Sequence, residues 1–257
     1  MSTLKTLSQF YFGHTVTVNN SALDFKEGLG PELNANLRVG SYSLTEFAAE
    51  VQRALRESGS QAYGVSVNRA TRVLTVTAPS AFTLLASTGS RIGSGVYALA
   101  GFNATDVTGT SVSGQNASGK VYRPQYLLKN YTAVEHNPLK ESASVQISAS
   151  GVVQVLSFGE GNRVKMNMIA ITNKTGMKTK PFFENADGIE DALEFLNYLI
   201  TKATVEFMPD VATPATFSKL LLDSTKADRN GTSFELKNMG VPDFYESGDL
   251  IFRKVIA

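Results

Sequence analysis

The clearest candidate for chemistry in this sequence is a glycine-rich segment, GQNASGKV, which runs from Gly114 to Val121. It matches the G-x-x-x-x-G-K part of a phosphate-binding loop, in which backbone amides hold the phosphates and the lysine reaches the terminal ones. However, Val121 stands where a Ser or Thr would contact magnesium, and Pro124 opposes the helix that would follow such a loop. We therefore interpret the segment as a flexible Gly/Ser linker that binds no nucleotide.

The two histidines, His14 and His136, are the next candidates, because imidazole can ligate a metal or act as a general base. They share no helical spacing, and neither has the companion residues of a metal-binding motif or a catalytic triad. The chain contains no cysteine, which excludes disulfides, thiolate metal sites and cysteine nucleophiles. We therefore predict no catalytic, cofactor-binding or metal-binding residues, with one histidine partly packed and one exposed, and we do not expect an enzyme.

The charge distribution argues against a nucleic-acid partner. Lys+Arg 24 nearly balance Asp+Glu 23, which gives a formal net charge of +1. The one locally basic segment, NKTGMKTK at 173–180, lacks the interleaved aromatic or arginine residues of a nucleic-acid surface. Glu190, Asp191 and Glu194 lie at the start of a predicted helix, where the helix dipole explains acidic residues without catalysis. No apolar run approaches the ~18 residues of a membrane span, so we expect no membrane partner.

The most regular element that the sequence predicts is a helix over 43–57. Ser43 and Glu46 have the S-x-x-E spacing of a capping box, and Gly59 follows closely enough to end the helix. Apolar residues then recur at helical spacing, which gives the helix one apolar face. We expect this face to lie on a sheet.

The rest of the first half is typical of strands and turns. Alternating apolar residues predict a hairpin over 63–78 that turns at 68–71. Further expected elements are a strand within 9–18, a strand at 82–87, a helical turn or apolar loop at 95–102, and a long exposed loop or linker at 103–120.

The second half repeats this pattern of strands with one helix. Asp187 and Glu190 form a D-x-x-E cap for a helix over 188–202, and Thr213 with Pro214 predicts the start of another helix over 213–225. Strands are expected at 143–148, 152–158, 164–172, 204–208, 232–237 and 249–256. The predicted fold is α+β with two β-rich domains, 1–120 and 121–257. Each is an antiparallel sheet or split barrel with one packed helix, 43–57 in the first and 188–202 in the second.

Several second-half segments resemble the ring-forming part of bacteriophage distal tail proteins and of related tail-tip (baseplate) and tail-tube proteins. They are SGVVQVLSFGEGNRVKMNMIAITN at 150–173, DGIEDALEFLNYLITKATVEFMPD at 187–210, FSKLLLDST at 217–225 and the GTSFELKN and YESGDLIFRKV ends. The helix and hairpin of the first half are similar to a module of virion proteins. The resemblance implies a virion structural protein, made in the host cytoplasm, that forms a hexameric ring and joins the tail tube to hub or receptor-binding proteins.

Other functions remain open beside this one. In the distal tail proteins the ring-forming part comes first, whereas here it comes second, so a tail-tube, adaptor or fibre-attachment role is an alternative. A receptor- or carbohydrate-binding module is another, although no Trp occurs and Tyr97, Tyr122 and Tyr131 do not cluster along the sequence.

A predicted subunit interface follows from the expected hairpin over 152–172. Alternation places Val153 and Val155 on one face of its first strand, and Ile169 and Ile171 on a corresponding face of its second strand, opposite Met166 and Met168. One helix can cover only one of the two apolar faces. We therefore predict that Val153, Val155, Ile169 and Ile171 contact a neighbouring copy in a homo-oligomeric ring.

Overall fold

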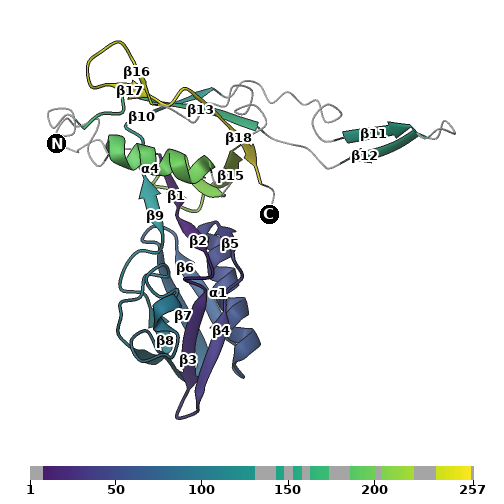
Figure 1. The fold of residues 1–257 in the computed structure, drawn as a ribbon, viewed down its shortest axis with the longest axis vertical. Helices are drawn as coiled ribbons and strands as arrows, with labels where there is room; N and C mark the ends of the chain where they lie inside the picture. The colour runs from purple at the N-terminus through teal and green to yellow at the C-terminus, as the bar shows by residue number, and fades with distance from the viewer. Residues whose placement is uncertain are drawn as a thin grey trace.

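The computed structural model describes residues 8–130, 143–147, 153–157, 163–173, 186–200, 204–222 and 236–255. Over these ranges the chain is rich in strands, which pair antiparallel in curled sheets, and it contains two α-helices, α1 (Leu44–Ser58) and α4 (Ile189–Ile200) (Figure 1). The strand-rich character that the sequence predicts is therefore confirmed. No helix in these ranges is long and apolar enough to span a membrane.

The larger sheet has seven strands and carries α4 on one face. Its strand order is β10 (Tyr126–Asn130), β13 (Arg163–Ile169), β18 (Asp249–Lys254), β15 (Ser218–Leu222), β14 (Val205–Met208), β1 (Gln9–Phe12) and β9 (Lys120–Tyr122). Phe195 and Leu199 of α4 are fully buried in one cluster with Phe10 and Phe252 of the sheet. This cluster is the core beneath α4.

The second sheet has five strands and carries α1. Its order is β4 (Glu32–Asn36), β3 (Ala22–Glu27), β7 (Val73–Leu84) and β6 (Gly64–Asn68), with β8 (Val107–Ser113) also paired with β7. The pairing of β7 with β8 shifts register between Thr77 and Phe82, on either side of Pro79. Because of this irregularity, β7 pairs with β6 before Pro79 and with β3 after it, and the sheet curls around α1.

Short strands complete the described structure. They are β2 (His14–Val16) with β5 (Gly40–Tyr42), β11 (Ala143–Ile147) with β12 (Val153–Ser157), and β16 (Lys237–Asn238) with β17 (Tyr245–Glu246), besides one 3₁₀ turn at Ile92–Ser94. In Figure 1 the β11–β12 ribbon lies to one side, away from α1 and α4.

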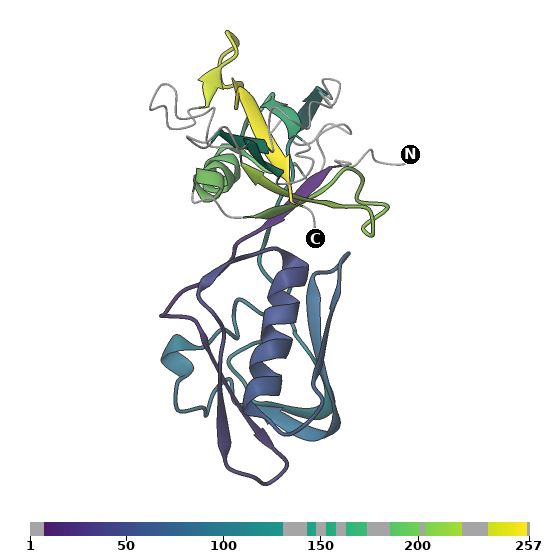
Figure 2. The same ribbon diagram turned by 90° about the vertical axis from the view of Figure 1, so that its right-hand side faces the viewer.

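Residues 14–118, which we call the insert, lie in the chain between β1 and β9, two neighbouring strands of the seven-stranded sheet. The insert contains α1 and the five-stranded sheet and lies below the seven-stranded sheet in Figures 1 and 2. Strands β1 and β14 are consequently buried on both faces. Phe10 and Phe207 join the core under α4, whereas Tyr11 and Met208 join the core of the insert.

The predicted helix over 43–57 and the predicted hairpin over 63–78 are confirmed. Helix α1 has both hydrogen bonds of the capping box, Glu46 N–H to Ser43 Oγ and Ser43 N–H to the Glu46 carboxylate. The hairpin is β6 and the first part of β7, paired from Gly64–Thr77 to Asn68–Val73.

Two predictions in the first half are wrong. The strand expected at 82–87 is the end of β7 and not a separate element. The linker expected at 103–120 contains β8 and the start of β9. Ser, Thr and Gly give β8 little hydrophobic signal, and its pairing with β7 supplies the hydrogen bonds that stabilise it.

Two predictions in the second half are also wrong. The helix expected from Thr213 is a turn followed by β15, in which Leu220 and Leu222 are buried between β14 and β18. The hairpin expected over 152–172 does not form, because β12 pairs with β11 while β13 pairs with β10 and β18. In the first case tertiary pairing overrides local propensity, and in the second β12 pairs with the preceding strand in place of the following one. The helix at 188–202 is confirmed as α4, although 201–203 lie outside the described residues.

Phe47 of α1 tests the packing of this helix. It is fully buried in the core of the insert with Tyr63, Leu74 and Val76. We expect Phe47→Ala to lower the free energy of unfolding by about 3–5 kcal/mol, through lost burial and the cavity left behind. Ala49→Gln, at an exposed position of the same helix, is the control and should change it by less than about 0.5 kcal/mol. Equal effects of the two changes in urea denaturation would contradict this packing.

Candidate functional site: the junction of helix α1 and the seven-stranded sheet

The phosphate-loop match at 114–121 is hydrogen-bonded within the chain. The N–H groups of Gly114, Asn116 and Ser118 donate to the carbonyl oxygens of Leu74, Gly101 and Arg72 at 2.9 Å each. A phosphate would need these amides free. The segment is thus a packed connection, which corrects the interpretation as a flexible linker, and its geometry offers no phosphate cradle.

His14 is fully buried, more than the partial packing that we predict, and His136 lies outside the described residues. His14 Nε2 lies 3.0 Å from Ser118 Oγ, and its ring centroid lies 5.2 Å from that of Phe47. Burial, with a smaller contribution from the Arg72 guanidinium, lowers the pKa of His14 to about 4. His14 is therefore neutral at pH 7. No group of three or more His, Asp or Glu residues in the described part of the chain could hold a metal ion.

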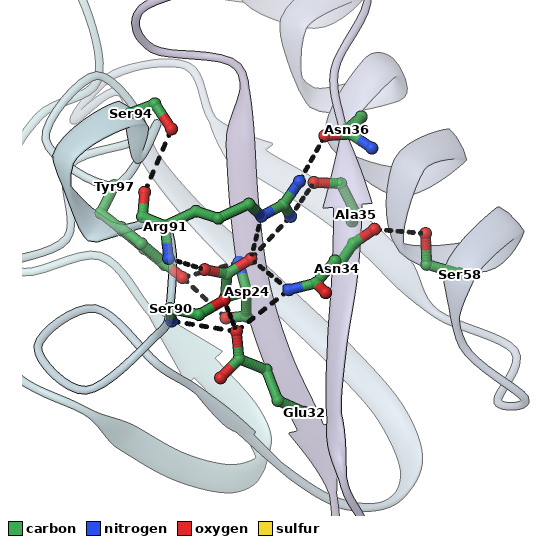
Figure 3. A network of polar contacts seen from close by, with 10 residues as sticks. All are labelled: Asp24, Glu32, Asn34, Ala35, Asn36, Ser58, Ser90, Arg91, Ser94 and Tyr97. Atoms are coloured by element: carbon green, nitrogen blue, oxygen red, sulfur yellow. Dashed lines mark hydrogen bonds and ion pairs between the residues drawn. The ribbon is translucent and has the colours of Figure 1, made fainter.

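Asp24 is the most buried carboxylate of the insert, and Figure 3 shows how donors surround it. Its Oδ1 accepts from Arg91 Nε at 2.8 Å, Arg91 Nη2 at 2.6 Å and Asn34 Nδ2 at 2.9 Å. Its Oδ2 accepts from the Arg91 backbone N–H at 2.7 Å. Arg91 also donates to Asn36 Oδ1 and to the Ala35 carbonyl. Because these hydrogen bonds join Arg91 to residues of both strands, Asp24 links the loop after β7 to β3 and β4.

Other carboxylates of the insert fasten loops in the same way. Burial raises the pKa of Glu27, but this carboxylate accepts from the Ser60 hydroxyl, from the N–H groups of Ser60 and Gln61 and from the Tyr63 hydroxyl, and these bonds together lower the pKa. Burial raises the pKa of Asp106, but the hydroxyl and N–H groups of Thr88 and Ser87 all donate to it and together lower the pKa. These groups stabilise loops as anions and are engaged by internal donors.

The polar cluster that joins the insert to the seven-stranded sheet centres on Glu206 of β14, which is fully buried. Its Oε1 accepts from the Thr45 backbone N–H and from Thr45 Oγ1, both at 3.1 Å. Its Oε2 lies 2.5 Å from Arg69 Nη2. Thr45 is in the first turn of α1, so a carboxylate from one sheet satisfies a free amide of the helix on the other and faces the positive end of its dipole.

Arg69 extends this junction to the segment before β15. Its Nε donates to the Pro214 carbonyl at 3.0 Å, and its guanidinium carbon lies 3.3 Å from the centroid of the Phe217 ring. Its own carbonyl accepts from the Tyr11 hydroxyl at 2.6 Å. A second contact, Lys219 Nζ to Glu46 Oε1 at 3.1 Å, links β15 to the first turn of α1. The arrangement holds α1 end-on against the seven-stranded sheet, as Figure 2 shows.

Sequence reasoning missed Glu206 and Arg69. A signal was present for Glu206, since it interrupts the apolar run TVEFM of a predicted strand. A charge at such a position is retained in a core when it is paired and hydrogen-bonded. Arg69 lies in the hairpin turn after β6, where an arginine is ordinary, so nothing marked it.

The predicted interface residues do not share one hairpin. Val153 and Val155 lie on β12, and Ile169 lies half-buried on β13. Ile171 is fully buried in the same core as Met166 and Met168, although alternation predicts the opposite face. The cause is Ala170, whose φ of 56° interrupts the strand before Ile171.

Two comparisons with known proteins give no relative from which a role could be taken. The sequence matches no protein-family model, and no curated protein matches it significantly. The site therefore has to be interpreted from its own geometry.

Glu206→Ala tests the junction. Removing one partner of a buried, hydrogen-bonded ion pair leaves the other charge uncompensated, so we expect a loss of about 3–5 kcal/mol in the free energy of unfolding. Glu206→Gln, which can still accept from Thr45, should lose less. A loss under about 1 kcal/mol for Glu206→Ala would show that the junction contributes little.

Lys120→Ala tests both the phosphate-loop match and an exposed ion pair. Lys120 Nζ contacts Glu194 Oε1 of α4, and both side chains are at least half exposed. We expect a change within about 0.5 kcal/mol and unchanged assembly, because exposed ion pairs contribute little. Binding of a nucleotide to the wild-type protein, lost in Lys120→Ala, would overturn this interpretation.

Proposed function

We propose that the chain is a structural subunit of a bacteriophage tail tip or baseplate, which forms a ring and joins the tail tube to hub or receptor-binding proteins. The observation that carries the proposal is that the described polar clusters fasten the chain's own elements together. Asp24, Glu27, Asp106 and Glu206 each accept from loop or helix amides. Asp24 and Glu206 are buried, and Glu27 and Asp106 are partly exposed. Carboxylates used in this way favour a rigid building block over a catalyst or a small-molecule binder.

We further propose two domains, of which the first is one continuous chain segment and the second is made of the segments on either side of it. The core of the insert, with α1, and the core under α4 form two separate clusters of buried residues. Both cores contain residues of β1 and β14, which fits two sheet-and-helix units sharing these strands. The division into 1–120 and 121–257 places β1 with the first unit, whereas its pairing with β14 and β9 favours the second.

The β11–β12 ribbon is the part of the described chain that best fits a contact with another subunit. Its register places Val145 opposite Val155 and Ile147 opposite Val153, and it pairs with no other strand among the described residues. An isolated two-stranded hairpin is marginally stable in water. We propose that a neighbouring copy covers the ribbon in the ring, so that Val153 and Val155 are interface residues.

A receptor- or carbohydrate-binding module is the alternative from another class. Such modules present aromatic rings on exposed loops, but Tyr97 and Tyr122 are buried, being 5% and 1% exposed. Tyr131 lies outside the described residues. The tail-tube and adaptor roles differ from the tail-tip role only in position within the particle, and negative-stain images of assembled rings beside isolated tails would separate them.

Val155→Lys is the experiment that tests the ring. A lysine ammonium cannot be desolvated cheaply at a packed interface, so we expect a folded protein that no longer assembles. Gln154→Lys, at the adjacent register position and thus on the opposite face of the ribbon, is the matched control and should still assemble.

For both variants, circular dichroism measures whether the protein is folded, and multi-angle light scattering measures whether it assembles. A wild-type protein that is monomeric at every concentration and binds glycans would favour the receptor-binding alternative. Rings formed equally well by Val155→Lys would move the interface elsewhere, and unfolding of Val155→Lys alone would make this face internal core.

A further inference from the structure

The insert is tied to the seven-stranded sheet by two adjacent chain segments, 12–14 and 118–120, which we call the neck. The segments lie side by side, since Phe12 pairs with Lys120 at the end of the β1–β9 ladder. Each contains a glycine with positive φ, Gly13 at 90° and Gly119 at 62°. His14 and Ser118 are therefore the first residues of the insert on the two segments, and they are bonded to each other across the neck.

His14 is enclosed at this point. A Cβ at position 119 would lie 2.4 Å from His14 Cε1 and 2.8 Å from the Phe12 carbonyl oxygen, so the imidazole lies directly on the Gly119 backbone. Phe47 of α1 lies against the ring from the insert. The site has no room for a side chain at position 119.

The hydrogen bonds determine the tautomer of His14. Ser118 Oγ donates its single hydrogen to the Leu99 carbonyl at 2.9 Å, so toward His14 it acts as an acceptor. Nε2, 3.0 Å away, must then carry the imidazole hydrogen. Nδ1 is left with a lone pair, is buried, and has no hydrogen-bond partner.

We propose that His14 is a proton-sensitive latch of the neck, closed while Nδ1 is unprotonated and released when acid protonates it. A proton on Nδ1 creates a buried N–H that has no acceptor and a buried positive charge beside Arg72 of the β6–β7 turn. Both costs are relieved when segment 12–14 separates from segment 118–120 and the ring reaches water. The proposal concerns the coupling of insert and sheet, and it holds whether or not the chain is a tail protein.

Tyr198 of α4 is hydrogen-bonded to Thr15 and to the Gly13 backbone beside His14, and the other ionisable groups on the elements packed around His14 are engaged elsewhere. Tyr42 of β5 donates to the Arg38 carbonyl, Glu46 is bound by Ser43 and Lys219, Glu50 by Arg53, and Lys120 by Glu194. Arg72 donates to the Ser118 carbonyl at 3.2 Å, so it is fixed next to the latch. No acidic group is among the causes that shift the pKa of His14, and none would offset its positive charge.

The direction of the pH dependence follows from the pKa of His14, which is about 4 in the closed neck against a usual 6.5. The open neck binds the proton more tightly, so closure is unaffected above pH 6.5 and loses stability as the pH falls from 6.5 to about 4. Each unit of difference is tenfold, so the closed-to-open ratio falls by up to about 300-fold across this window.

The first test uses the full wild-type chain labelled with ¹⁵N-histidine. The two histidines give two sets of ring signals, assigned with His136→Gln. We expect His14 to be the neutral Nε2–H tautomer at pH 7 and to remain neutral until well below pH 6. A charged His14 at pH 7, an Nδ1–H tautomer, or titration near 6.5 would each overturn the proposal.

The second test follows the neck itself by hydrogen exchange with mass spectrometry between pH 7 and pH 4, corrected for intrinsic exchange rates. We expect peptides covering 12–16 and 116–122 to lose protection in acid before the β3–β7 core does. His14→Gln keeps a donor for Ser118 but cannot titrate, so it should remove this step, whereas His136→Gln should keep it. The same acid step in His14→Gln would overturn the proposal, and if that variant does not fold, the tautomer and titration of the wild type decide.

Discussion

The Glu206 carboxylate at the first turn of α1 is the interaction on which the arrangement of the described chain depends. It belongs to β14, yet it accepts from Thr45 and pairs with Arg69, both in the insert. A helix end carries free amides and a positive partial charge, and a buried carboxylate needs donors and a positive neighbour. Each side of the junction thus supplies what the other requires. The helix, its sheet and the seven-stranded sheet are held in one orientation as a result.

Carboxylates, buried or partly exposed, have the same role throughout the insert. Asp24, Glu27 and Asp106 bind backbone amides of loops that the hydrophobic core does not hold. At the buried Asp24 position, an apolar side chain would leave the Arg91 amide without its partner, which costs more than the hydrogen bond itself contributes. A chain with a modest share of charged residues can thus position long loops.

The insert is attached to the seven-stranded sheet at two places, the junction and the neck. The junction is a polar contact beside the neck, since Glu206 lies opposite Tyr11 in the β1–β14 ladder and the Tyr11 hydroxyl donates to the Arg69 carbonyl. The neck is a pair of glycine-containing chain segments tied by the His14–Ser118 bond. Two attachments of this kind restrict both rotation and separation. That rigidity is what a subunit of a ring needs if neighbouring copies are to meet at constant angles, in line with the proposed role in a phage tail.

The sequence by itself determined the elements whose stabilising contacts are local. The capping box of Ser43 and Glu46, the apolar stripe of α1 and the β6–β7 hairpin lie within a few residues along the chain, so their patterns predict them. Only the tertiary structure decided the rest. Strands β8 and β15 are stabilised by partners that local sequence does not reveal. Strand β12 is equally close in the chain to β11 and β13, and only the folded chain decided that it pairs with β11. Arg69 and Glu206 are 137 residues apart, and His14 and Ser118 are 104 apart. These residues matter because folding buries them against partners that are distant in the chain. No single segment of the sequence contains both partners, so only the folded chain reveals the contact.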